Sequence, residues 1–222
     1  MSRTQRELKA LRQAQREEAL RRQRTQDRRN LLLIAAGVVV LGVAILLVAA
    51  YLNHQSQAGS GNRLAWQDLS GQTAGTQIAD EGTATHIDPS TTWHYKFYPP
   101  TSGPHYGQPY APVPWQTVDQ TLSEGQFVHN LEHGGIVILY NCPGGSDCDK
   151  LKSELTNYVK NLAPLEPTYH EVKLVLTPYS KGMQKKVALV AWHWVEFLDG
   201  YDQNEITRFY EIHADQGPEQ VP

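Results

Sequence analysis

Gly135 to Tyr140 (GIVILY) is the stretch that decides the fold, because its five consecutive apolar residues predict a strand buried on both faces. Residues 149–162 (DKLKSELTNYVKNL) follow closely and carry apolar side chains at helical spacing. One helical face collects Leu151, Leu155, Tyr158, Val159 and Leu162. The sequence therefore predicts a central strand followed directly by an amphipathic helix.

Two more apolar segments and one more helix follow. Residues 171–177 (EVKLVLT) and 186–197 (KVALVAWHWVEF) have the composition of strands, and the turn at 180–182 between them contains a glycine, which predicts a hairpin. In residues 204–213, one helical stripe collects Ile206, Phe209, Tyr210 and His213. The order strand, helix, strand, strand, helix predicts an α+β fold with a mainly antiparallel sheet and flanking helices.

The chain before this regular half is irregular. Residues 63–126 are dense in Pro, Gly, Thr and Tyr and contain only short apolar pieces, so we expect mostly ordered loop there. Residues 63–222 comprise about 160 residues, which suffice for one domain with a sizeable core and are too few for two. We expect a single domain over this range.

Residues 31–52 predict a transmembrane helix. They are twenty-two consecutive uncharged and mostly aliphatic residues, and a helix of that length reaches about 33 Å, enough to cross a hydrocarbon core of about 30 Å. A cleaved signal peptide, with Val48 and Ala50 before the cleavage site, is the alternative, but the apolar part of such peptides is shorter, about 7–15 residues. We expect an uncleaved, single-pass signal anchor in the cell membrane.

Charge predicts the orientation and bears on partners. Residues 1–30 hold ten Lys or Arg against four acidic residues, which predicts a cytoplasmic N-terminus and an extracytoplasmic domain. This basic segment could also attract anionic lipid headgroups. Beyond it, residues 53–62 (NHQSQAGSGN) predict a flexible linker. From residue 53 onward, ten basic residues face nineteen acidic ones, which favours cations over nucleic acid as ligands.

The chain has two cysteines, Cys142 and Cys148, just after the predicted central strand. On the oxidising side of a membrane we expect a structural disulfide. Closing so short a ring stabilises by roughly 2 kcal/mol, so its main effect would be to fix the strand-to-helix turn. Redox or metal-binding use is the alternative, although the two-residue spacing of redox dithiols is absent.

Four of the nine histidines lie in unusual contexts: His86, His105, His129 and His133. If residues 127–133 are extended, His129 and His133 point to the same side and Glu132 points away. Neutral imidazoles pointing into one pocket would suit Cu(II) or Zn(II). We expect the other five to be bonded to backbone or packed: His54, His94, His170, His193 and His213.

A helical geometry for the same segment is the rival interpretation. His129-x-x-Glu132-His133 matches the inverted zinc-protease signature, in which two histidines one turn apart bind zinc and the glutamate acts as base. Little chain separates Gly125 from the glycines at 134–135, so the strand geometry is preferred. The sequence does not fix a third zinc ligand for this geometry; Glu205 and Glu211 are examples of candidates.

Several motifs together carry a family resemblance. They are Gly82 with His86 and Ile87, residues 98–106 (YPPTSGPHY), residues 128–137 (VHNLEHGGIV), residues 176–179 (LTPY), Ala191 with Trp192, and residues 217–219 (GPE). The chain resembles the bacterial domain-of-unknown-function family 3105 over nearly the whole predicted domain. The resemblance implies a small extracytoplasmic protein, usually membrane-anchored, without an assigned activity. The four histidines and Glu132 match the family motifs, whereas the two cysteines look like a feature of only some members.

The sequence supports three hypotheses for function. The first is an extracytoplasmic metal-binding domain, with copper preferred and zinc as alternative, whose ligands are His105, His129 and His133 with His86 as fourth. The second is a non-catalytic module that binds another envelope protein through its Pro-rich loops. The third is a zinc-dependent hydrolase with Glu132 as base. A role without catalysis is favoured over the hydrolase.

Overall fold

The computed structural model describes residue 42 and residues 62–222. The predicted basic segment (1–30), transmembrane helix (31–52) and linker (53–62) lie outside the described residues, except for Gly42 and Asn62. Within the part that is described, no helix is both long and apolar enough to cross a bilayer.

Five strands form the main sheet, in the order β1-β7-β6-β4-β5. Their bounds are β1 (Thr76–Gln77), β4 (Ile136–Tyr140), β5 (Leu174–Pro178), β6 (Val187–Ala191) and β7 (Trp194–Leu198). The β1/β7, β7/β6 and β6/β4 pairs are antiparallel and the β4/β5 pair is parallel. The predicted α+β class with a mainly antiparallel sheet is therefore confirmed.

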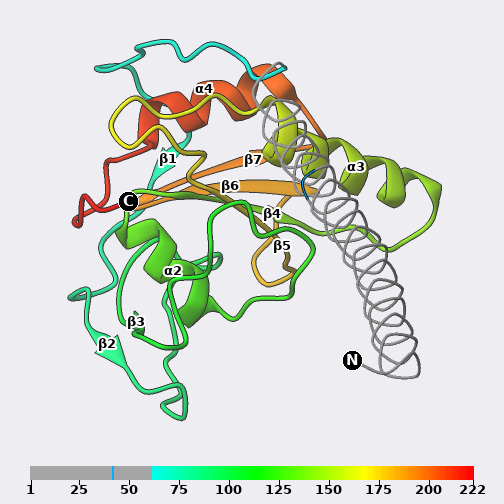
Figure 1. The fold of residues 1–222 in the computed structure, drawn as a ribbon. Helices are drawn as coiled ribbons and strands as arrows, with labels where there is room; N and C mark the ends of the chain where they lie inside the picture. The colour runs from blue at the N-terminus through cyan, green and yellow to red at the C-terminus, as the bar shows by residue number, and fades with distance from the viewer. Residues whose placement is uncertain (1–41, 43–61) are drawn as a thin grey trace, which may run out of the picture. The chain divides into compact units, whose positions relative to one another are not determined.

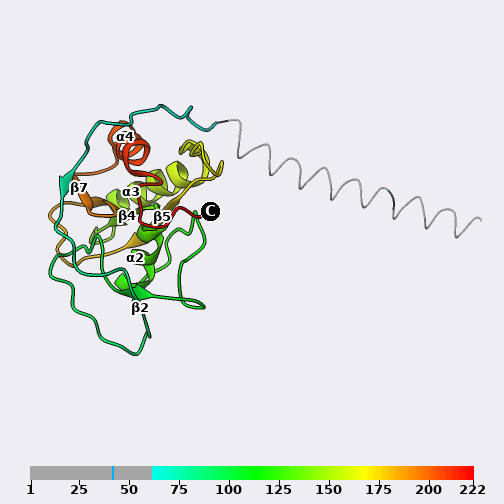
Figure 2. The ribbon, with the colours of Figure 1, turned by 90° about the vertical axis from the view of Figure 1, so that its left-hand side faces the viewer.

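Helices cover both faces of this sheet (Figures 1 and 2). One face carries α3 (Ser146–Asn157), which continues as the π-helical turn η1 (Tyr158–Leu162), and α4 (Gln203–His213). The opposite face carries α2 (Glu124–Glu132) and the small parallel pair β2 (His86–Ile87) and β3 (His105–Tyr106). The predicted helices over 149–162 and 204–213 are thus confirmed, the first beginning three residues earlier.

The period of two in β4 divides the core into two layers. Ile136 and Ile138 pack with Phe209 of α4, whereas Val137 and Leu139 pack with residues of α2 such as Leu131. All six side chains have relative exposures of 1% or less. Burial of each contributes about 1.5–3 kcal/mol, so the layer under α2 fixes the position of this helix and of its outward-facing side chains.

The predicted hairpin between residues 171–177 and 186–197 is wrong. β4 lies between β5 and β6: α3 connects β4 to its parallel neighbour β5 on one side, and the chain then passes β4 to add β6 on the other side. The hairpin occurs instead inside 186–197, where Trp192 and His193 connect β6 to β7. His193 adopts φ +65°, and the usual Asn or Gly signal of such a turn is missing from the sequence.

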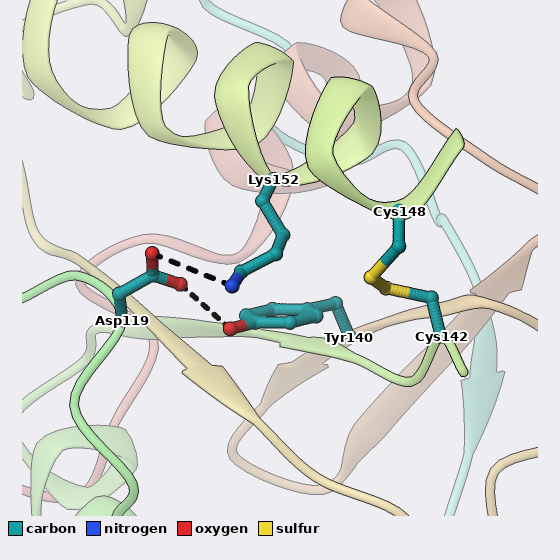
Figure 3. Close-up of a disulfide and its surroundings, with 5 residues drawn as sticks. All are labelled: Asp119, Tyr140, Cys142, Cys148 and Lys152. Carbon is teal, nitrogen blue, oxygen red and sulfur yellow. Dashed lines mark hydrogen bonds and ion pairs between the residues drawn. A yellow bond between two sulfur atoms is a disulfide. The ribbon is translucent and has the colours of Figure 1, made fainter. Parts of the chain in front are cut away.

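The predicted disulfide is present and joins the residues after β4 to the first turn of α3 (Figure 3). The Cα atoms of Cys142 and Cys148 lie 5.5 Å apart. Beside the bridge, the Tyr140 hydroxyl donates to Asp119 Oδ1 at 2.6 Å and Lys152 approaches the same carboxylate at 3.9 Å. The bridge fixes the strand-to-helix turn, and neither cysteine belongs to the histidine cluster described next.

Candidate metal site

Helix α2 and its C-cap residue, His133, supply three of the candidate side chains, and the helix overturns the predicted strand over 127–133. The helix begins after Ser123, whose backbone N–H donates to the Gln126 side chain at 3.1 Å. This Ser-x-x-Gln capping pair was the signal for a helix start that the strand interpretation overlooked. Because the segment is helical, His129 and His133 lie one turn apart and Glu132 does not point away from them.

The short strands β2 and β3 bring two more histidines to the same place. They pair in parallel with His86 opposite His105, so the two rings come within 5.1 Å between centroids. Close packing of β3 on α2 depends on Gly125, since a Cβ there would lie 2.7 Å from the ring of Tyr106. Segments distant in sequence therefore meet at one face of α2.

Four side chains form the first cluster: His86, His105, His129 and Glu132. One ligand atom from each lies within 4.8 Å of the ligand atoms of all the others. His105 Nε2 lies 2.8 Å and His86 Nε2 3.8 Å from Glu132 Oε2, and the His86 and His129 rings stack at 4.9 Å. His105, His129 and Glu132 are buried, whereas 55% of the His86 side chain is exposed. The cluster is thus a pocket with one exposed member.

Main-chain carbonyls fix the two buried imidazoles. His105 Nδ1 donates to the carbonyl of Gly103 at 2.9 Å, and His129 Nδ1 donates to the carbonyl of Tyr106 at 2.6 Å. A ring with Nδ1–H in such a bond presents a lone pair at Nε2. Histidines that bind metals in proteins are oriented in the same way by a carbonyl or carboxylate at the other nitrogen.

Burial and mutual charge set the electrostatics of the cluster. Burial lowers the pKa of His129, and the neighbouring imidazoles lower it further. The hydrogen bond to the Tyr106 carbonyl raises this pKa but does not cancel the decrease. Burial also lowers the pKa of His133. For Glu132, burial raises the pKa, but the hydrogen bond from His105 and the nearby imidazoles outweigh it and lower the pKa overall. These directions favour neutral imidazoles at His129 and His133 beside an ionised Glu132, and metals bind to neutral imidazoles and ionised carboxylates.

A second cluster adjoins the first and consists of Glu132, His133 and Glu219, whose ligand atoms also lie within 4.8 Å of one another. His133 Nε2 lies 3.4 Å from Glu219 Oε2 and 3.0 Å from His129 Nε2. Glu132 is therefore common to both clusters. Glu219 comes from the C-terminal tail, and the sequence signalled it only through the 217–219 motif.

The predicted ligands are thus mostly, but not wholly, brought together. His86, His105 and His129 converge as expected, whereas His133 falls into the neighbouring cluster and Glu132 joins both. The two candidate third ligands of the zinc-hydrolase geometry lie outside both clusters: Glu205 pairs with Arg208, and Glu211 accepts from the backbone N–H of Gln67.

Of the five histidines assigned no metal role, His54 lies outside the described residues. His213 bonds to the Ala74 carbonyl at 2.9 Å, as expected of a histidine with a packing role. Among the residues the structure describes, His94, His170, His193 and His213 belong to neither cluster.

Fold and site together define an α+β domain with a largely buried histidine and carboxylate cluster that could hold a metal ion. The family model described as "Protein of unknown function (DUF3105)" matches residues 86–222, and the chain belongs to that family. The match includes every residue of both clusters. No curated protein and no solved structure matches the chain.

Proposed function

We propose that this protein is a membrane-anchored, extracytoplasmic metal-binding protein that holds a divalent transition-metal ion on His86, His105, His129 and Glu132. The observation that carries the proposal is the orientation of the two buried imidazoles. Both give Nδ1–H to a main-chain carbonyl and leave Nε2 for neighbouring site residues: Nε2 of His105 lies 2.8 Å from Glu132 Oε2, and Nε2 of His129 lies 3.0 Å from His133 Nε2. A purely structural histidine needs no such convergence.

The contact between His105 and Glu132 supports a cation at this place. Both ring nitrogens of His105 face acceptors, with Gly103 O at 2.9 Å and Glu132 Oε2 at 2.8 Å. Once Nδ1 has donated its hydrogen to Gly103, a proton or a metal ion must separate Nε2 from the carboxylate oxygen. An ion that also reaches His129 and His86 satisfies all four side chains at once.

The spacing suits a single ion after a small adjustment. Ligands at about 2.0–2.1 Å from one ion lie at most about 4.2 Å apart, close to the 4.8 Å limit that encloses the four atoms. His86 has room to move because more than half of its side chain is exposed. The exposed histidine would complete the coordination and give the ion an entry path.

Copper is the first candidate and zinc the alternative. Imidazole ligands suit both ions, and intrinsic affinity favours Cu(II) over Zn(II). The disulfide and the predicted anchor support an oxidising, extracytoplasmic location for the site. The apolar run over 31–52 and the basic segment before it support attachment to the membrane with the N-terminus in the cytoplasm.

The structure agrees with the zinc-hydrolase alternative in the helix that it requires but not in the position of the catalytic base. α2 places His129 and His133 one turn apart, as the inverted signature requires. However, Glu132 is bonded to His105 and lies in the ligand cluster, so its carboxylate is not held apart to activate water. Metal binding without catalysis is therefore the function that the site supports best.

The test is the metal content of the full-length chain purified in detergent, measured by elemental analysis, with electron paramagnetic resonance for copper. We expect bound copper or zinc in the wild type and its loss in the double variant His129→Ala, His133→Ala. The control is His94→Ala, which removes an exposed histidine outside both clusters.

Absence of copper and zinc from the wild type after reloading, or retention of the ion by the double variant, would overturn the proposal. The envelope-module hypothesis would then account for the clusters as structural. It predicts that His105→Ala lowers thermal stability by the same amount with and without metal ions.

A further inference from the structure

The second cluster depends on a C-terminal tail that folds back on the end of α2. The Glu219 N–H donates to the Glu132 carbonyl at 3.0 Å, and the Asp215 N–H donates to the Gly134 carbonyl at 2.9 Å. Between them, Gly217 approaches so closely that a Cβ there would lie 2.2 Å from the Glu132 carbonyl oxygen. These contacts hold the Glu219 side chain over His133.

A buried lysine anchors the same tail. The Lys173 side chain is fully buried, and its Nζ donates to Asp215 Oδ1 and to the Val221 carbonyl, both at 2.6 Å. These two partners lie on either side of Glu219 in the sequence. A buried cation is costly unless it is paired, so the contacts of Lys173 fix the tail against the domain. The fixed tail in turn places Glu219 beside His133.

His133 contacts residues of both clusters through one ring nitrogen. Its Nδ1 is buried without a hydrogen-bond partner among the described residues, so its polar contacts run through Nε2. That nitrogen faces Glu219 at 3.4 Å and His129 Nε2 at 3.0 Å. Nε2 of His133 therefore lies at the border of the two clusters, between the Glu219 carboxylate and the His129 ring.

We propose that the site is dinuclear: the first ion is bound as described above, and a second divalent ion is held by His133 and Glu219, with Glu132 bridging the two. This inference rests on the proposed function. A carboxylate has two oxygens and can bind one ion through each, and paired ions in proteins lie about 3.5–4 Å apart. The shared glutamate and the 3.0 Å contact between His129 Nε2 and His133 Nε2 make the two subsites close enough for such an ion pair.

The two subsites differ in chemistry and access. The first offers three imidazoles and one carboxylate, and the second offers one imidazole and two carboxylates. Half of the Glu219 side chain is exposed (52%), whereas Glu132 is buried. Because nitrogen ligands favour Cu(II) and Zn(II), the second ion binds more weakly and exchanges faster than the first.

The experiment is a Cu(II) titration of the metal-free, full-length protein, followed by electron paramagnetic resonance. We expect the first equivalent to give the signal of an isolated Cu(II) ion. The second equivalent should couple to the first, so that the signal stops growing or falls and a half-field transition appears. In Glu219→Gln the first equivalent should bind as before, while affinity for the second falls at least about tenfold, the loss that even outer ligand partners cause.

Glu205→Gln is the control, because it makes the same change on α4 at a residue outside both clusters. Coupled copper in this control and in the wild type, but not in Glu219→Gln, supports the bridge. Binding of one ion only, or unchanged coupling in Glu219→Gln, overturns the dinuclear site and leaves the proposed function intact. Absence of any binding overturns both.

Discussion

Replacing Glu132 by Gln separates metal binding from a purely structural role of the cluster. Without metal, the change exchanges an ionised acceptor for a neutral one opposite His105, at 2.8 Å. Hydrogen bonds to charged groups contribute about 1.5–3 kcal/mol and neutral ones about 0.5–1.5, so the loss is about 1–1.5 kcal/mol. For a domain of this size the melting temperature should fall by about 2–6 °C.

With metal bound, the difference in melting temperature between the wild type and Glu132→Gln should grow. Losing an outer-shell partner alone weakens metal binding by about 10–100-fold, and Glu132 is a proposed direct ligand, so a 100-fold loss is a modest expectation. At an ion concentration about 1,000 times the wild-type Kd, binding stabilises the wild type by about 4.1 kcal/mol and the variant by about 1.4 kcal/mol. The metal-induced rise in melting temperature should therefore be about 5–11 °C smaller in the variant.

Scanning calorimetry of the full-length protein, with and without Cu(II) or Zn(II), measures both effects. Glu205→Gln again serves as the control and should respond to metal like the wild type. An equal metal-induced rise in the wild type and in Glu132→Gln would refute Glu132 as a ligand. No rise in either protein would refute the metal site.

Three further predictions concern the rest of the domain. The double variant Cys142→Ser, Cys148→Ser should lose roughly 2 kcal/mol, or about 4–8 °C in melting temperature, with unchanged metal stoichiometry, which calorimetry and elemental analysis check. Lys173→Met should destabilise by about 3–5 kcal/mol in denaturant titrations because it leaves the Asp215 carboxylate without its buried partner, and adding Asp215→Asn should restore part of the loss. Burial raises the pKa of Glu196 above its ordinary 4.5, so ionisation destabilises the folded state as pH rises through this range. Glu196→Gln should therefore raise the melting temperature at pH 7, and a benefit that persists below about pH 4 would contradict this reasoning.

Local patterns were sufficient for the elements that carry most of the core. The apolar run in β4 and the helical spacing in α3 and α4 predicted these elements, because each buries a continuous face. Strand pairing was not predictable in the same way. β5 pairs with β4 and does not pair with β6, although β6 is the next strand in the sequence.

The candidate site shows the same division. The unusual contexts of His86, His105 and His129 were visible in the sequence, and the structure brings these three side chains together. The position of Glu132 is harder to predict because the nine residues of α2 are too few for a clear helical period, so the cap at Ser123 is the main sequence signal for this helix. Glu219 could not be foreseen from spacing, since only the folded tail brings it to the end of α2.

X-ray absorption spectroscopy of the full-length protein loaded with one equivalent of Zn(II) tests the metal site most directly. We predict nitrogen and oxygen ligands at about 2.0–2.1 Å, with the outer-shell scattering of at least three imidazole rings that disappears in the His129→Ala, His133→Ala variant. A spectrum of oxygen ligands alone, without imidazole scattering, would contradict the account.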